Sequence, residues 1–262
     1  MLEGFHDWVE CVLTCAALSL FSSNLATTAA PHLSAAITTA IQDGARPQSD
    51  TARDANRKPA ETLAFAGVKA GDKIADYAAG SGYFTRLFAG VAGPSGHVYA
   101  SVPAPLYQYP NIVKGTADLE AFSYTHPNVS VAFGSPLAAA DYPEKLDVFF
   151  ISQNYHDLHD SFMGPVDMAA FNRKVFQDLK PGGVYLVLDH VAATGSAADV
   201  TDTLHRIEPD VVRREVEAAG FKFESQSAVL ANSQDPHTAG VFDPSIQGRT
   251  DQFIFKFRRP RT

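Results

Sequence analysis

Residues 73–86, KIADYAAGSGYFTR, combine a short apolar strand, an acidic residue, a turn of small residues and the start of a helix. The strand spans Lys73–Tyr77, and apolar residues then recur at helical spacing, namely Phe84, Leu87, Phe88 and Val91. The turn between them, residues 78–82, carries almost no side chain. A ligand can therefore lie against backbone N–H groups at the start of the helix, with Asp76 fixing its polar end.

Strand-like and helix-like segments alternate along the rest of the chain. Strands are predicted at residues 97–101, 129–133, 147–152, 184–189, 221–227 and 251–257, and helices at 59–66, 83–91, 116–124, 166–179 and 208–219. Such alternation predicts an α/β fold with a mostly parallel sheet and helices on both faces. Because ligands bind beyond the carboxyl ends of parallel strands, the important loops are those after Asp76, Ser101, Phe133, Ser152 and Asp189.

Four segments together resemble the class I S-adenosylmethionine-dependent methyltransferases, namely residues 73–86, 147–160, 177–190 and 249–259. The run NYHDLH at residues 154–159 and the pair Asp189-His190 are similar to bacterial proteins described as predicted methyltransferases, often with an export signal. The resemblance covers residues 50–260. It implies a Rossmann-like, doubly wound, seven-stranded sheet with an antiparallel last strand. It also implies S-adenosylmethionine as cofactor and a small molecule as methyl acceptor.

The resemblance also implies a cofactor site, made of Asp76, Ala78, Gly80, Gly82, Tyr83, Ser101, Ser135 and Asn154. Alanine replaces the first glycine of the family's motif, which is a mild change if its φ is negative. Two acids of the wider pattern are missing. Ser101-Val102 stands where an acid normally binds the ribose hydroxyls, and Ser135 where an acid normally meets the adenine. Since a hydrogen bond to a carboxylate contributes about 1.5–3 kcal/mol, we expect weak cofactor binding.

Histidines gather after the predicted strand ends. Because imidazole titrates near neutral pH, His156 is predicted to be the general base, and Asp157 or His190 to orient it or the substrate. Further residues are predicted to contact the substrate, namely Tyr155, His159, His205 and His237. A zinc or iron site from His156, His190 or His205 with a carboxylate is an alternative, but the ligand spacing is not diagnostic, and no metal is predicted.

Composition limits the classes of partner. A chain of 262 residues with 45% apolar residues can bury the core of one enzyme-sized domain. The net charge of −8 and the lack of a basic stripe argue against a nucleic-acid partner. The loop at residues 230–249 lacks helical periodicity, and it is predicted to be either a lid that leads to an antiparallel edge strand or a mobile excursion. The oligomeric state is not predicted.

Three regions are expected, namely a signal peptide or leader at residues 1–30, a helical segment at 31–70 and a methyltransferase-like domain at 71–262. Residues 12–21 are apolar but too few for a bilayer span, which needs about 20, so no stable membrane span is predicted. A signal peptide predicts a periplasmic or secreted protein. The first basic residue is Arg46, however, so a docking helix or a mis-assigned start also fits, and the protein is cytoplasmic if the leader is not a signal.

Three functions therefore remain open. The first is a small-molecule methyltransferase that uses S-adenosylmethionine, with the acceptor activated by a histidine base. The second is an enzyme of the same fold whose His/Asp cluster catalyses hydrolysis, elimination or isomerisation without that cofactor, which the missing acids favour. The third is a non-catalytic binding protein, against which the histidines at the strand ends argue.

Overall fold

The computed structural model describes residues 33–134 and 141–262. The predicted leader and Ser135 fall outside the described residues, so neither prediction is tested. The α-helices of the described chain are α1 (Ala35–Ile41), α2 (Gln48–Thr51), α3 (Asp54–Arg57), α4 (Pro59–Ala66), α5 (Tyr83–Ala92), α6 (Pro110–Thr125), α7 (Met168–Asp178), α8 (Val200–Leu204) and α9 (Pro209–Ala218). Short 3₁₀ helices are η1 (Ala104–Gln108), η3 (His156–His159) and η4 (Ser161–Met163).

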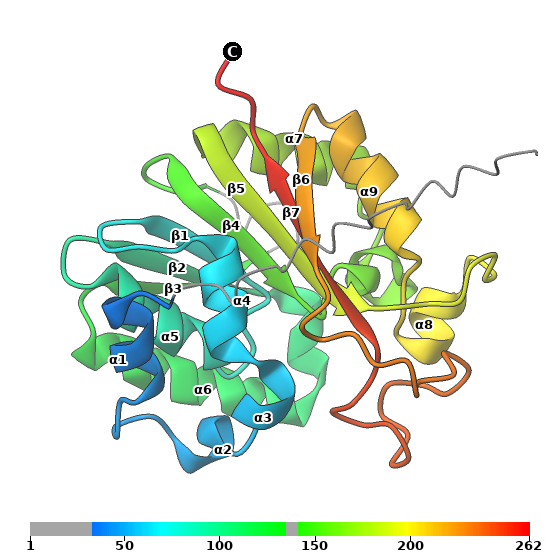
Figure 1. Ribbon diagram of the computed structural model, residues 1–262, viewed down its shortest axis with the longest axis horizontal. Helices are drawn as coiled ribbons and strands as arrows, with labels where there is room; N and C mark the ends of the chain where they lie inside the picture. The colour runs from blue at the N-terminus through cyan, green and yellow to red at the C-terminus, as the bar shows by residue number, and fades with distance from the viewer. Residues whose placement is uncertain (1–32, 135–140) are drawn as a thin grey trace, which may run out of the picture. The chain divides into compact units, whose positions relative to one another are not determined.

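The strands form one seven-stranded sheet in the order β3-β2-β1-β4-β5-β7-β6 (Figure 1). They are β1 (Lys73–Tyr77), β2 (His97–Pro103), β3 (Val129–Gly134), β4 (Leu146–Ser152), β5 (Leu179–His190), β6 (Lys222–Ser227) and β7 (Gln252–Arg258). The pairs from β3 to β5 are parallel, and β7 is antiparallel to both β5 and β6. The predicted Rossmann-like, doubly wound fold with an antiparallel last strand is confirmed.

The last strand was expected to form an edge of the sheet, but it does not. β7 lies between β5 and β6, so β6 forms that edge. The side chains of β7 explain this position. Phe253 and Phe257 are buried in the hydrophobic cluster on one face of the sheet, and Ile254 is buried in the cluster on the other face. A strand that is apolar on both faces needs a neighbour on each side and a helical layer over each face.

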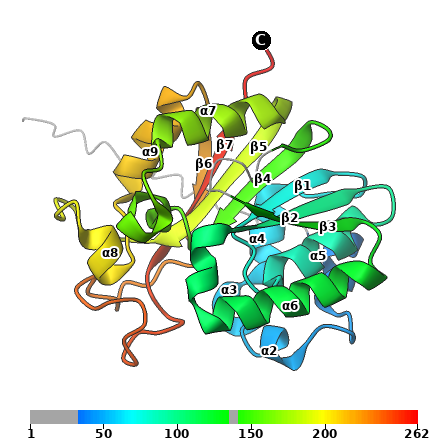
Figure 2. The same cartoon turned by 180° about the vertical axis from the view of Figure 1, so that it is seen from behind.

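Helices cover the two faces of the sheet (Figures 1 and 2). The adjacent residues Phe149 and Phe150 of β4 show how one strand serves both layers, because successive side chains of a strand point to opposite faces. The Phe150 ring contacts Phe88 of α5 with centroids 5.2 Å apart. The Phe149 ring contacts Phe171 of α7 with centroids 6.2 Å apart.

Some boundaries differ from those expected. α6 begins at Pro110 rather than near Thr116, because proline fits the first turn of a helix. Residues 180–183, between the predicted helix at 166–179 and the predicted strand at 184–189, belong to β5, whose Leu179 already pairs with Leu146 of β4. α7 begins two residues later than predicted, at Met168, because the Asp167 side chain accepts a hydrogen bond from the Ala170 N–H and caps the helix.

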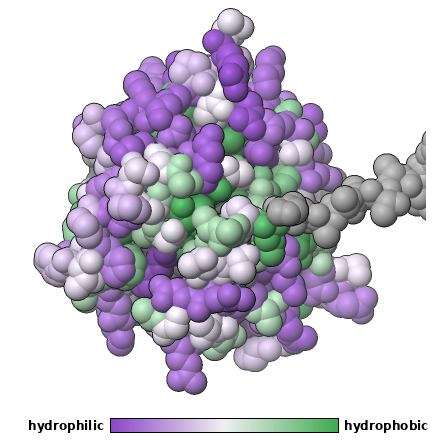
Figure 3. Space-filling view, turned by 60° about the vertical axis from the view of Figure 1, so that its left-hand side comes forward, coloured by the Kyte–Doolittle hydropathy of each residue, from purple (hydrophilic) through white to green (hydrophobic). Residues whose placement is uncertain are grey.

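Hydrophilic side chains cover most of the face shown in Figure 3, and apolar side chains gather near its centre. In the part of the chain that the structure describes, no helix combines the length and the apolarity that a membrane crossing requires. Two large apolar side chains are the most exposed, Tyr124 at 85% and Phe242 at 65%. Phe242 belongs to the loop at residues 230–249, so this loop presents an aromatic ring to solvent.

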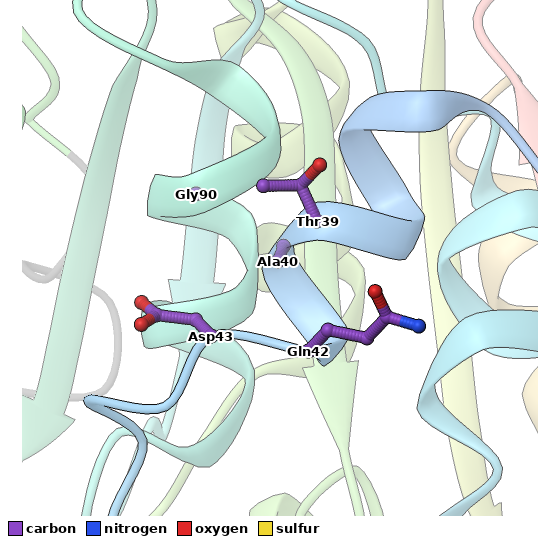
Figure 4. A pocket seen from close by; sticks show the side chains of 5 residues that line it. All are labelled: Thr39, Ala40, Gln42, Asp43 and Gly90. Carbon is purple, nitrogen blue, oxygen red and sulfur yellow. The ribbon is translucent and has the colours of Figure 1, made fainter.

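A hollow lies beside α1 and α5 (Figure 4). Its lining consists of Thr39, Ala40, Gln42, Asp43 and Gly90. A Cβ on Gly90 would lie 3.0 Å from the Ala40 Cβ, so the glycine lets the two helices approach closely. The lining offers one carboxylate and no histidine, which makes it a packing feature rather than a candidate for chemistry.

Candidate functional site

A cleft of about 590 Å³ lies where β1, β4 and β5 end, at the edge of the sheet that the fold predicts for ligands. Its volume is within the range of small-molecule sites. The walls come from the β1–α5 turn, the segment after β4, His190, η1 with the start of α6, and the loop at residues 230–249. The lining residues used below are Arg53, Arg57, Asp76, Ala78, Gly80, Tyr83, Gln153, Asn154, His156, Asp157, His190, His205 and Phe242.

The turn after β1 is open toward this cleft. A Cβ on Gly80 would meet no atom within 4 Å, whereas a Cβ on Gly82 would lie 2.6 Å from Leu119 Cδ1. Gly80 therefore faces the cleft and Gly82 packs against α6. Ala78 has a φ of +56°. The condition under which this alanine is a mild change, a negative φ, is thus not met, and the turn holds a non-glycine residue in the left-handed region, where an L side chain is strained.

Asp76 lies at the base of the turn with only 3% of its surface exposed. Its Oδ2 accepts a hydrogen bond from Thr85 Oγ1 at 2.6 Å. Burial, which penalises the carboxylate, raises the pKa of Asp76 to about 7, although the Thr85 hydrogen bond and the charge of Arg57 oppose this shift. The carboxyl group is thus poised to ionise when a cation arrives in the cleft.

Two arginines that sequence reasoning missed, Arg53 and Arg57, reach the cleft from α3 and its N-cap position. Their guanidinium groups lie over the Tyr83 ring, at 4.9 and 4.7 Å from its centroid. The Tyr83 hydroxyl in turn donates to Asp54 at 2.6 Å. No local motif marks these arginines, because they are brought to the cleft by the packing of an N-terminal helix. They give one end of the cleft a positive charge suited to a carboxylate.

His156 is buried between two carboxyl groups. Its Nδ1 lies 2.8 Å from Asp189 Oδ1, and its Nε2 lies 3.2 Å from Asp157 Oδ1. The His156 backbone N–H also donates to Asp189 Oδ2 at 2.8 Å. Burial alone would lower the pKa of His156, but the charge of Asp189 and the hydrogen bonds with Asp157 and Asp189 raise it to about 10. In these surroundings His156 carries a proton at neutral pH.

A chain of hydrogen bonds runs from the arginines to His190. Arg57 Nη2 donates to Gln153 Oε1 at 2.6 Å, and Gln153 Nε2 donates to Gln252 Oε1 at 3.1 Å. Gln252 Nε2 donates to Thr250 Oγ1 at 3.1 Å, and this oxygen lies 2.7 Å from His190 Nδ1. The chain joins three separate parts of the sequence across the end of β5.

The direction of this chain constrains the hydrogen bond to His190. Arginine can only donate, so each amide must accept with its oxygen and donate with its nitrogen. The Thr250 oxygen therefore accepts from Gln252, and the same hydroxyl group makes a second hydrogen bond with His190 Nδ1. Burial lowers the pKa of His190 to about 3, so the ring is neutral. With Nδ1 engaged by Thr250, His190 Nε2 is the ring nitrogen left for a group in the cleft.

The structure brings together some predicted site residues and separates others. All three predicted catalytic residues and most of the predicted cofactor residues line the cleft, as does His205. Ser101 does not line the cleft, and its buried Oγ has no hydrogen-bond partner among the described residues. Gly82, Tyr155, His159 and His237 are also absent from the lining.

The three remote substrate candidates have other partners. The Tyr155 hydroxyl donates to Glu215 at 2.8 Å, and His159 Nε2 lies 3.2 Å from the same carboxylate. His237 Nε2 pairs with Asp251 Oδ2 at 2.9 Å. Tyr155 and His159 thus share Glu215 as their partner instead of lining the cleft. Their positions do not support the predicted contacts with the substrate.

No protein-family model matches the chain, and no curated protein does. Solved structures do match, and they give the sheet and its helices the fold of the class I S-adenosylmethionine-dependent methyltransferases. One of these is a SAM-dependent methyltransferase from Aquifex aeolicus, with 16% identity, coverage of 79% of this chain and 98% of the other, and a TM-score of 0.52.

Two further structures show how widely this fold is used. The cyclase SpnF matches with 17% identity over 84% of this chain and 85% of its own, with a TM-score of 0.56. An arsenic(III) S-adenosylmethionine methyltransferase from Chlamydomonas reinhardtii matches with 15% identity over 86% of this chain and 73% of its own, with a TM-score of 0.51. At these identities the likeness defines the fold, and the function has to be argued from the cleft.

Proposed function

We propose that the protein is an S-adenosylmethionine-dependent methyltransferase that acts on a small molecule. The observation that carries this proposal is the open turn at Gly80, which stands over the N-terminus of α5 and next to the buried carboxyl of Asp76. Backbone N–H groups at a helix start and a carboxyl group suit the two charged ends of an amino acid. The fold, the position of the cleft and its volume agree with this function.

The methionine part of the cofactor would lie between the arginines and the turn. Its ammonium group fits Asp76, whose ionised form a nearby cation favours. Its carboxylate fits Arg53 and Arg57, which form the positive end of the cleft. The nucleoside part has weaker support, because Ser101 at the end of β2 is buried and is absent from the cleft lining. We therefore expect affinity to come mainly from the methionine part.

The acceptor would lie toward His156, His190 and His205, which line the other end of the cleft. A methyl transfer needs a nucleophile held in line with the sulfonium methyl group, so orientation makes a large contribution to the rate. His190 Nδ1 is engaged with Thr250, so its Nε2 is left to hold the acceptor by a hydrogen bond. His156 was predicted to be the general base, but its two carboxyl partners keep it protonated, as the pKa of about 10 indicates. We therefore assign His156 and Asp157 to positioning the acceptor in the resting protein.

A second candidate function is chemistry without the cofactor, as in the alternative of hydrolysis, elimination or isomerisation. The missing acid at Ser101 favours it, since the site loses a charged contact to the ribose. The cyclase SpnF shares the fold. This candidate uses the same His/Asp cluster and predicts that S-adenosylmethionine does not bind.

Gly80→Val tests the proposed function. The branched side chain would enter the open space of the cleft and block the approach of a ligand, so we expect the stabilisation of the protein by S-adenosylmethionine in a thermal-shift assay to disappear. Gly195→Val is the matched control. Gly195 also has a positive φ, of 78° against 55° for Gly80, and a Cβ there would also meet no atom within 4 Å. If both variants respond to the cofactor like the native protein, the proposed site is wrong.

A further inference from the structure

Three side chains in the cleft place their ligand atoms around one point. His156, Asp157 and His205 each offer one nitrogen or oxygen, and these atoms all lie within 4.8 Å of one another. His156 Nε2 is 3.2 Å and His205 Nδ1 is 3.7 Å from the same atom, Asp157 Oδ1. Ligands that share one tetrahedral ion at about 2.0–2.2 Å are themselves about 3.4 Å apart. The spacing is therefore close to that of a coordination shell.

The groups behind these ligands complete the pattern of a metal site. A histidine that binds a metal usually gives its other ring N–H to a carboxylate, and a ligating carboxylate is itself hydrogen-bonded. Asp189 Oδ1 accepts a hydrogen bond from His156 Nδ1 at 2.8 Å. Asn154 Nδ2 donates to Asp157 Oδ2 at 2.6 Å, which leaves Oδ1 for the ion. The two buried ligands are thus held in place from the side away from the shared point.

The charge around the three ligand atoms also favours a cation. Asp157 and Asp189 are buried with 6% and 0% of their surface exposed. Asp160 is 2% exposed, and neither of its carboxyl oxygens has a hydrogen-bond partner among the described residues. A divalent ion at the shared point would bring positive charge to these buried carboxyl groups.

We propose that His156, Asp157 and His205 bind a divalent first-row transition-metal ion of the zinc or iron(II) type. Two imidazoles and one carboxylate suit these metals, and three protein ligands leave positions open to the cleft. His190 is not counted among the ligands, because its atoms do not belong to this group and its Nδ1 is engaged with Thr250 Oγ1. An ion at this place would lie where the acceptor is expected and would lower the pKa of a bound hydroxyl group. This last point rests on the proposed function, but the binding of the metal does not.

Calorimetry with Zn²⁺ alone tests the site. The full chain is freed of metal with a chelator, dialysed and titrated in the absence of S-adenosylmethionine, and we expect one Zn²⁺ per chain. Titration with Co²⁺ should give visible absorption bands from a site with nitrogen and oxygen ligands. His205→Ala removes one ligand from a side chain that is 27% exposed, so the variant should stay folded. It should bind Zn²⁺ at least about 100-fold more weakly, since the loss of an outer partner already costs 10–100-fold.

His237→Ala is the matched control. The His237 side chain is 26% exposed and pairs with the carboxylate of Asp251, and the residue has a positive φ, as His205 does. Unlike His205, His237 is absent from the cleft lining. It should leave Zn²⁺ affinity and the Co²⁺ bands unchanged. The proposal is overturned if the native chain binds no Zn²⁺, or if the two variants weaken binding equally. Binding of S-adenosylmethionine is measured separately, so the failure of one proposal leaves the other standing.

Discussion

Asp76→Asn should make the protein more stable above neutral pH and should weaken cofactor binding. The carboxyl of Asp76 is 3% exposed, and burial raises its pKa from the ordinary 3.8 to about 7. In the unfolded chain the group ionises near 3.8, while in the folded protein it keeps its proton up to about pH 7. The folded state therefore binds more protons between these values, and stability falls as the pH rises through this window.

The magnitude follows from the two pKa values. The full difference corresponds to about 4 kcal/mol, and the part that falls between about pH 5 and about pH 8 is roughly 2–3 kcal/mol. An asparagine has no proton to lose and can still accept the Thr85 hydrogen bond through its side-chain oxygen. The variant should therefore lack this contribution to the pH dependence and exceed the native protein in stability at the higher pH.

Urea unfolding of both proteins at about pH 5 and about pH 8 measures the effect. The native protein and the variant share every other titrating group. The difference between their changes in unfolding free energy from about pH 5 to about pH 8 therefore reports Asp76 alone. Glu224→Gln provides a control that should change stability equally at both pH values, since hydrogen bonds from Arg258 lower the pKa of Glu224 to about 2 and its titration lies below this range. If Asp76→Asn loses stability equally at both pH values, the buried carboxyl is not protonated in the folded state, and the argument fails. The same variant should bind S-adenosylmethionine at least about tenfold more weakly, a loss expected for one charged hydrogen bond.

Three further predictions concern other parts of the chain. Arg206→Ala should lower the free energy of unfolding by about 3–5 kcal/mol in urea titrations, because it leaves the fully buried Asp235 without its cation, and a loss below about 1 kcal/mol would contradict this. Thr250→Val removes the hydrogen-bond partner of His190 Nδ1 and should change the ¹⁵N NMR signals of this imidazole, and an unchanged spectrum would refute the hydrogen-bond chain. If the leader is a signal peptide, N-terminal sequencing of protein from the native host should begin near Ala30, whereas an intact Met1 in the cytosolic fraction would argue against export.

Much of the fold was accessible from the sequence, because it depends on local patterns. The strands of residues 73–77 and 147–152 are short apolar runs, and their ends carry the polar groups that line the cleft. Adjacent parallel strands place these ends side by side, so the meeting of His156 with His190 follows from topology. Their ring centroids are 6.0 Å apart. In the last strand, Phe253, Phe255 and Phe257 lie in one cluster, as the alternation of side chains along a strand requires.

The rest depended on information that a single strand or helix does not contain. Arg57 reaches the cleft because an N-terminal helix packs over the β1–α5 turn, and no motif at this residue indicates it. The charge of His156 depends on Asp189, a contact between residues 33 positions apart. The position of β7 inside the sheet depends on the chain crossing back after β6. Long-range packing, rather than local pattern, therefore decides which groups titrate and which donate.

The central claim is that the cleft beside Gly80 and Asp76 binds S-adenosylmethionine, and isothermal titration of the native full chain with this compound tests it most directly. The account predicts saturable binding of one molecule per chain, competition by S-adenosylhomocysteine, and proton release at about neutral pH as Asp76 ionises. Repeating the titration in buffers of different ionisation enthalpy measures that proton. The absence of heat and of competition at millimolar concentrations of both compounds would contradict the claim and favour chemistry without the cofactor.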